Sequence, residues 1–300
     1  MPIEPRRARA ARNGRRPWYP PLLLPAVLLV LPIVWVLGKG RESTARAGYG
    51  WLDPAAIEFE LPTEGTDPRW EVALRSKIER FGSAALDDGR RITQLREELE
   101  ALSFVAETDD PRVVWPVGIE FPIRVRLPRA CVVVGEGFLA VDEEGVVLDG
   151  PHATPPRVGR GFLPVIAPVD DGRFDRVAPG DRLTDEADLD ALAIADSMWT
   201  HLPPPALELL GRTTIDAREA RRTSVTCAGA VIALEETRAI AFGRSPREGH
   251  VASLPVELKW QHVVDGLLTL SGPEARDWSE LDARMDVATF EWRGVNDEAR

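Results

Sequence analysis

A stretch of nineteen uncharged, mostly apolar residues near the N-terminus sets the strongest limit on the fold of this chain. Residues 20–38 read PPLLLPAVLLVLPIVWVLG. At about 1.5 Å per residue, a helix of this length is about 28 Å long, close to the hydrocarbon thickness of a bilayer. Pro25 and Pro32 would break a helix in water, but membrane-spanning helices tolerate proline where the freed carbonyl groups find other partners. The sequence therefore predicts one membrane-spanning helix.

The charges on either side of this stretch predict its orientation. Six arginines precede it, whereas the basic residues that follow are fewer and are partly offset by Glu42. The positive-inside rule then places residues 1–19, a basic tail, in the cytoplasm, and the bulk of the chain in the periplasm. Trp18 and Tyr19 lie where interfacial aromatic residues are expected.

A cleaved signal peptide is the alternative interpretation of the same stretch. Ala45-Arg46-Ala47 has the small-x-small form of a cleavage site. Three charged residues separate this tripeptide from the apolar run, which favours a retained anchor. In both cases the body of the chain is exported.

Charge divides the chain into a basic tail and an acidic body. Residues 1–46 have a net charge of +7, and the remainder has a net charge of −18. An acidic body argues against a nucleic-acid groove, because such a groove needs Lys and Arg to displace counterions from the phosphate backbone. Cys131 and Cys227 lie in apolar, strand-like runs, so we expect two small buried side chains rather than a disulfide.

Helical periodicity follows a polar linker at residues 39–52 and a short strand at residues 57–61. Asp67-Pro68 combines an N-cap with proline at the first helical position, and a second helix is expected from about residue 88 to residue 102. Alternation at residues 119–125 then indicates a strand with one wet face. The side chains expected to point inward from the two helices are Trp70, Leu74, Ile78, Phe81, Ile92, Leu95, Leu99 and Leu102.

The second half of the chain mixes strand and helix patterns. We interpret a phase shift within the last alternating run as a β-bulge on an edge strand. The expected elements are a hairpin of residues 138–141 and 146–148, an ordered loop from Pro151, a helix near residues 185–199, a hairpin of residues 228–234 and 239–242, a helix at 256–270, and a closing strand at 281–292.

Four strings in this order resemble the bacterial cell-division protein FtsQ (DivIB) family. ITQLREELEALSFVAE is similar to the second helix of the family's POTRA (polypeptide-transport-associated) domain, and RLPRA is similar to the junction that follows it. FLAVDEEGVVLDG is similar to the hairpin that opens the family's β domain, and GFLPVI to a loop within it. The motif residues that carry this resemblance are Arg126, Pro128, Ala130, Asp142, Gly145 and Pro164.

The resemblance implies an α+β architecture in which a membrane-spanning helix precedes two folded parts. These are a small POTRA-like βααββ domain at residues 53–128 and a mixed β-sheet domain with flanking helices at residues 129–295, followed by a tail at residues 296–300. It also implies a non-enzymatic scaffold of the septal cell-division machinery in the inner membrane, without cofactor, metal or nucleic acid. FtsB/FtsL-like division proteins, and the septal peptidoglycan synthase complex, are the partners that it suggests.

An open edge strand would supply the partner-binding surface. Such a strand offers unpaired N–H and C=O groups to which an extended segment can add. We expect this edge at residues 285–292, with Phe290 and Trp292 as apolar anchors if they are exposed; the alternative, in which both simply pack on the sheet, stays equally open. The predicted partner-binding residues are Met285, Val287, Ala288, Phe290 and Trp292.

Two other classes of exported, membrane-anchored envelope protein are the alternatives: a hydrolase and a translocation component. The four histidines, His152, His201, His250 and His262, are isolated in the sequence, without metal-ligand spacing or a Gly-x-Ser-x-Gly nucleophile setting, so we expect surface or loop residues. Paired acidic residues lie in expected turns, where solvation explains them. A translocation component would need many more amphipathic strands than this chain offers.

Overall fold

A computed structural model describes much of the chain after residue 50. The described residues are 35, 39, 51–52, 54, 57–59, 61, 66–85, 88–113, 119–170, 172–222, 227–249, 253–270 and 278–292. The predicted membrane-spanning segment lies outside them except for Trp35, as do the basic tail, most of the linker and the C-terminal tail. In the part of the chain that is described, no helix is both long and apolar enough to cross a membrane.

Two compact units divide the chain. One comprises residues 1–51 and 85–87, in which few residues are described; there the Lys39 ammonium lies 5.9 Å from the centroid of the Trp35 ring. The other comprises residues 52–84 and 88–300 and contains the remaining described residues. Its architecture is mixed α+β, as predicted, with a large mixed sheet and flanking helices.

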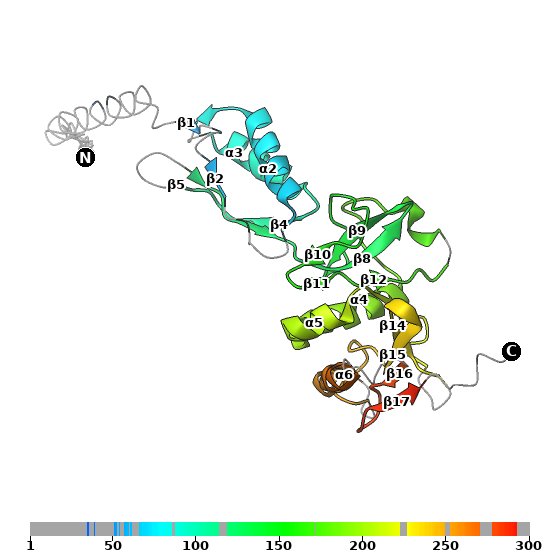
Figure 1. Cartoon of the computed structure of the whole chain (residues 1–300). Helices are drawn as coiled ribbons and strands as arrows, with labels where there is room; N and C mark the ends of the chain where they lie inside the picture. The colour runs from blue at the N-terminus through cyan, green and yellow to red at the C-terminus, as the bar shows by residue number, and fades with distance from the viewer. Residues whose placement is uncertain are drawn as a thin grey trace, which may run out of the picture. The chain divides into compact units, whose positions relative to one another are not determined.

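The elements that begin at residue 51 include the two predicted helices, α2 and α3, with short strands before, between and after them (Figure 1). Strand β2 pairs in parallel with β6, β5 pairs with β6 and β4 pairs with β7, both antiparallel. The elements are β1 (Trp51–Leu52), β2 (Ile57–Glu58), α2 (Pro68–Phe81), β3 (Ala84–Ala85), α3 (Gly89–Glu100), β4 (Val105–Thr108), β5 (Arg112–Val113), β6 (Ile119–Glu120) and β7 (Ile123–Val125).

Helix α2 begins as the sequence predicts. The Asp67 carboxylate accepts a hydrogen bond from the Arg69 backbone N–H at 2.8 Å, and Pro68 occupies the first helical position. The α2 side chains predicted to point inward are all buried, and in α3 the buried ones are Leu95 and Leu99. Trp70 stacks on Phe104 with ring centroids 4.9 Å apart.

The second half of the chain builds an eight-stranded mixed sheet of order β17-β16-β15-β14-β13-β12-β8-β9. Strand pairs β8/β12, β12/β13 and β15/β16 are parallel, and the others are antiparallel. The strands are β8 (Pro128–Val134), β9 (Gly137–Asp142), β12 (Val165–Ile166), β13 (Thr213–Asp216), β14 (Ala230–Leu234), β15 (Arg238–Gly243), β16 (Trp278–Asp282) and β17 (Thr289–Trp292).

Three helices pack on this sheet: α4 (Glu186–His201), α5 (Pro204–Leu210) and α6 (Val256–Leu270). Their apolar side chains share one core with the strands, to which α6 contributes Trp260, Val263 and Leu267. The smaller elements are the hairpin of β10 (Arg157–Val158) and β11 (Gly161–Phe162) and the 3-10 turns η2 (Arg173–Arg176) and η3 (Glu235–Thr237). The predicted helix at 256–270 and the predicted hairpin that turns at residues 235–238 are confirmed.

The prediction of one bulged closing strand over residues 281–292 is wrong. Residues 278–282 and 289–292 form an antiparallel hairpin, β16 and β17, and residues 283–288 are the connection between them. Met285, Val287 and Ala288 therefore lie in this connection and not in a strand. The phase shift in the alternation marks the turn, because a chain that reverses restarts its inward-facing pattern on the returning strand.

Candidate partner-binding edge

Strand β17 is the last strand of the large sheet and pairs only with β16 among the described residues. At the opposite end of the sheet, β9 is covered by the segment that follows it, through antiparallel bridges between Val141 and Val147 and between Phe138 and His152. One end of the sheet therefore has a covering segment, while β17, shown in red in Figure 1, presents an outer edge in the described part of the chain.

The predicted partner-binding residues differ in exposure. Met285 and Val287 are 50% and 71% exposed, whereas Ala288 and Phe290 are partly buried against the core. Phe290 is thus a packing residue of the sheet at least in part, in line with the second of the two expected alternatives. The Trp292 backbone lies opposite Trp278, and its side chain is outside the described part. The binding role of all five residues stays a prediction.

Helix α6 holds the β16–β17 hairpin through a close approach at Gly266. A Cβ atom on Gly266 would lie 2.9 Å from Leu281 Cδ2 and 3.3 Å from Phe290 Cε1, so a larger residue would meet both side chains. Leu281 and Phe290 are cross-strand partners and therefore share the face that packs on α6. Gly266 was not singled out from the sequence, because nothing local distinguishes it from any helical glycine.

An acid–arginine pair shapes the connection between the two strands. Asp282 Oδ1 accepts hydrogen bonds of 2.9 Å from both the backbone N–H and the Nε of Arg284, and Arg284 Nη1 donates to the Cys227 carbonyl at 2.9 Å. The Arg284 stem passes over Gly243, where a Cβ would lie 2.9 Å from Arg284 Cγ. These contacts bend the chain immediately after β16.

The face of the hairpin opposite α6 is acidic at its outer edge. Glu280 and Glu291 are cross-strand partners, and no ion pair involves either side chain among the described residues. Burial, and then the neighbouring carboxylates of Glu291 and Asp282, raise the pKa of Glu280 above its usual value, while the Arg284 charge acts in the opposite direction. Like charges directly opposite one another destabilise a pair of strands, so this arrangement weakens the hairpin in isolation.

The residues selected by the family resemblance meet at the start of β8. Arg126 Nη1 lies 2.7 Å from Asp142 Oδ2, and the Asp142 side chain is only 3% exposed. Asp142 Oδ1 accepts hydrogen bonds from the backbone N–H groups of Glu144 and Val146, at 3.0 and 2.7 Å, and Gly145 has the positive φ of +82° that the turn requires. This set fixes the turn after β9.

The remaining motif residues join β8 to its neighbours. Pro128 and Ala130 pair with Asp142 and Val141 across the β8–β9 ladder, and the Pro164 carbonyl accepts a hydrogen bond of 2.9 Å from the Cys131 backbone. Cys131 is buried, as expected, and burial raises the pKa of its thiol to about 12. Cys131 and Cys227 are both free thiols, but Cys227 is only half-buried, so the expectation of two buried side chains is wrong for Cys227.

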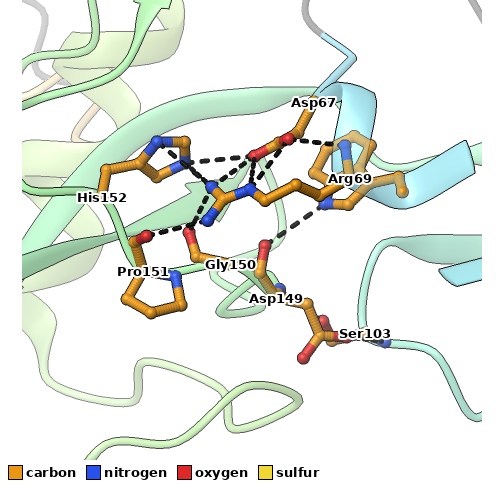
Figure 2. A network of polar contacts seen from close by, with 8 residues as sticks. Asp67, Arg69, Ser103, Asp149, Gly150, Pro151 and His152 are labelled. Carbon is orange, nitrogen blue, oxygen red and sulfur yellow. Dashed lines mark hydrogen bonds and ion pairs between the residues drawn. The ribbon is translucent and has the colours of Figure 1, made fainter. Parts of the chain in front are cut away.

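A second polar site, not anticipated from the sequence, joins α2 to the loop after β9 (Figure 2). Three consecutive carbonyl oxygens accept hydrogen bonds from α2: that of Asp149 from Trp70 Nε1 at 3.2 Å, that of Gly150 from Arg69 Nη2 at 3.1 Å, and that of Pro151 from Arg69 Nη1 at 3.0 Å. The Asp149 backbone N–H also donates to Ser103 Oγ at 2.7 Å.

His152 completes this site. Its Nε2 lies 3.1 Å from Arg69 Nη2 and 3.5 Å from Asp67 Oδ2. Burial and the Arg69 charge lower the pKa of His152, with Asp67 acting in the opposite direction. His152 is a loop residue, as expected, but it is not isolated. Arg69 and His152 are 83 residues apart in the sequence, so no local pattern predicts that they are in contact.

Buried charges on α4 and α6 were also missed. Asp190 pairs with Arg221 Nε at 2.9 Å, and Asp188 pairs with Arg173 at 3.0 Å. The Lys259 ammonium donates to the Arg244 carbonyl at 2.9 Å, and burial lowers the Lys259 pKa to about 8. In the described ranges, no three His, Cys, Asp or Glu side chains gather as a metal site would require.

Comparison with known proteins adds no relative to these observations. No family model matches the chain, and no curated protein matches it. The geometry of the β17 edge and the resemblance of the quoted strings are therefore the grounds on which a function can be argued.

Proposed function

We propose that this chain is a non-enzymatic, membrane-anchored scaffold of the septal cell-division machinery, similar to the FtsQ/DivIB family. Residues 20–38 are its anchor in the inner membrane, and residues 53–128 are a POTRA-like docking part. In the proposal, β17 binds an extended segment of an FtsB/FtsL-like partner by β-augmentation. The observation that carries the proposal is the outer edge of β17 at the end of the eight-stranded sheet.

Edge geometry supports this role over a purely structural one. An edge strand exposes a row of backbone N–H and C=O groups, which proteins either cover, protect with charges or bulges, or use to bind another strand. This chain covers the β9 end of its sheet with residues 146–152 and offers no such segment at β17 in the described ranges. Two exposed apolar side chains, Met285 and Val287, precede β17 directly and add apolar area for a partner.

The polar clusters support a scaffold for a different reason. Three clusters satisfy buried or half-buried polar atoms: Arg126 with Asp142, Arg69 with the carbonyl groups of residues 150–151, and Asp190 with Arg221. Each of these clusters ties together segments distant in sequence, which suits a rigid support for a binding edge.

The test is capture of a partner by the full chain in detergent. FtsB-like and FtsL-like proteins from the same genome are expected to co-purify with the wild type, and Phe290→Asp is expected to abolish their recovery. Leu209→Asp is the matched control, because Leu209 is 44% exposed on α5, outside both the POTRA-like part and the β17 edge, and an apolar side chain is likewise replaced by a carboxylate. Because Phe290 also packs on α6, Val287→Asp serves as a second edge variant and is expected to reduce recovery without unfolding.

Full recovery with both edge variants would refute the proposal. Equal loss with Leu209→Asp would show instead that capture depends on general surface polarity. Failure of the wild type to retain either partner, while its circular dichroism remains that of a folded α+β protein, would also count against a division role.

A further inference from the structure

Glu280 of β16 and Glu291 of β17 form an acidic pair at the β17 end of the sheet. They face each other across the β16–β17 hairpin, and the register makes them direct cross-strand partners. Asp282, the next acidic residue of β16, is paired with Arg284 at 2.6 Å, whereas Glu280 and Glu291 have no such cation in the described part of the chain. The Arg284 charge acts on Glu280 without forming an ion pair, so in the described part of the chain this acidic pair, which spans the last two strands of the sheet, is only partly compensated.

A strand that pairs with β17 would interact electrostatically with the carboxylates of this pair. Side chains directly opposite one another on neighbouring strands have Cβ atoms about 4.5–5.5 Å apart, so the residue added opposite Glu291 lies on the same face as both carboxylates. A cation at that position would interact favourably with two carboxylates, while an acid would extend the repulsion to a third strand.

We propose that the segment that adds to β17 carries Lys or Arg at the position opposite Glu291, with apolar residues on its other face beside Phe290. This inference rests on the proposed function and specifies the chemistry of its partner. The partner segment is therefore an extended strand in which a basic position alternates with apolar ones. Glu280 and Glu291 select it by charge, and the backbone of β17 supplies the hydrogen bonds.

The same pair disfavours a second copy of this chain as the occupant. A second β17 would bring another Glu291 to the acidic face instead of a cation, which adds to the repulsion. The net charge of −18 beyond residue 46 acts in the same direction, because it repels another acidic body and attracts a basic segment.

Synthetic peptides added to the full chain in detergent test the inference. The probe is a twelve-residue peptide of alternating Val and Thr with Lys at the two central polar positions; a second peptide has Glu there. A third peptide repeats the Lys sequence with N-methylated backbone amides on its bonding edge, which blocks strand addition but keeps the charge. Binding is measured by fluorescence anisotropy at low and at physiological salt.

The Lys peptide is expected to bind about tenfold more tightly than the Glu peptide at low salt, with a smaller ratio at physiological salt. Glu291→Lys is expected to reverse the preference, and Glu280→Gln to reduce it. Glu97→Gln is the control, because Glu97 is exposed on α3 and should leave the ratio unchanged.

The outcomes separate the inference from the proposed function. Equal binding of the Lys and Glu peptides, abolished by N-methylation in the Lys series, would leave strand addition standing and overturn the charge selection. A Lys preference that survives in Glu291→Lys would overturn it as well. Binding that N-methylation does not affect, or no binding of any peptide, would count against strand addition itself and so against the proposed function.

Discussion

Replacing Gly266 by alanine tests how α6 supports the β17 edge. Two effects oppose each other. Alanine is favoured over glycine in a helix interior by about 1 kcal/mol, because glycine loses more backbone entropy. Against this, the new Cβ would lie 2.9 and 3.0 Å from the two terminal methyl carbons of Leu281 and 3.3 Å from the Phe290 ring, so the nearest methyl group would have to move and the other two contacts would be tight.

Overpacking dominates if the neighbours cannot move away. Leu281 is fully buried, so its methyl groups have little free space, and overpacking of a well-filled core typically costs about 1–3 kcal/mol. We therefore expect Gly266→Ala to destabilise the protein by about 0–2 kcal/mol in total. The strain falls on Leu281 and Phe290, so the hairpin should loosen more than the rest of the sheet.

Hydrogen exchange of the full chain in detergent, read by mass spectrometry, measures this local effect. Peptides covering residues 278–292 are expected to exchange faster in Gly266→Ala, while peptides covering β8 and β9 stay unchanged. Gly89→Ala is the matched control, because a Cβ at this other helical glycine meets no atom within 4 Å. The reasoning is refuted if Gly266→Ala is more stable than the wild type to urea and protects residues 278–292 as well as Gly89→Ala does.

Two further predictions concern the polar clusters. Arg69→Ala should lower the free energy of unfolding in urea by about 1–2 kcal/mol, since it removes charged hydrogen bonds to two carbonyl groups from a half-exposed side chain. Arg80→Ala on the same helix should change this free energy by less than about 0.5 kcal/mol. Equal effects of the two variants would contradict a stabilising role for the site in Figure 2. Burial raises the pKa of Asp188 from 3.8 to about 6, so the folded state holds this proton more tightly than the unfolded state, and the stability that it contributes is lost as pH rises from about 4 to 6. Asp188→Asn should remove this loss, and urea unfolding curves that keep the same pH slope in the variant would show that another group causes it.

The regular elements could be predicted because their signals are local. Asp67-Pro68 and four apolar residues at helical spacing predict helix α2, and the structure places all four apolar residues in the core. The turn after β9 could be predicted for the same reason. Asp142 accepts the backbone hydrogen bonds of the turn, and Gly145, three positions later, supplies its positive φ.

What could not be predicted depends on contacts between distant segments. Helix α5 and strand β13 were not expected, because α5 begins within a proline triplet and is only seven residues long, and β13 is only four. The reversal at residues 283–288 has neither glycine nor proline and is bent by Asp282, Arg284 and the distant Cys227 carbonyl. The Arg69–His152 contact likewise depends on tertiary structure alone.

The acidic pair on β16 and β17 gives the open edge a consistent physical interpretation. An exposed edge strand invites uncontrolled pairing, and charges near the edge are one way in which proteins prevent it. Glu280 and Glu291 do this at the expense of some hairpin stability, since they repel each other across the ladder. The same repulsion becomes an attraction for a basic strand, so one feature both disfavours self-association and favours a particular partner. If Glu280 and Glu291 serve both purposes, replacing them together by glutamine should raise self-association of the full chain while it reduces discrimination between Lys and Glu peptides, and a change in only one of these would separate the two roles.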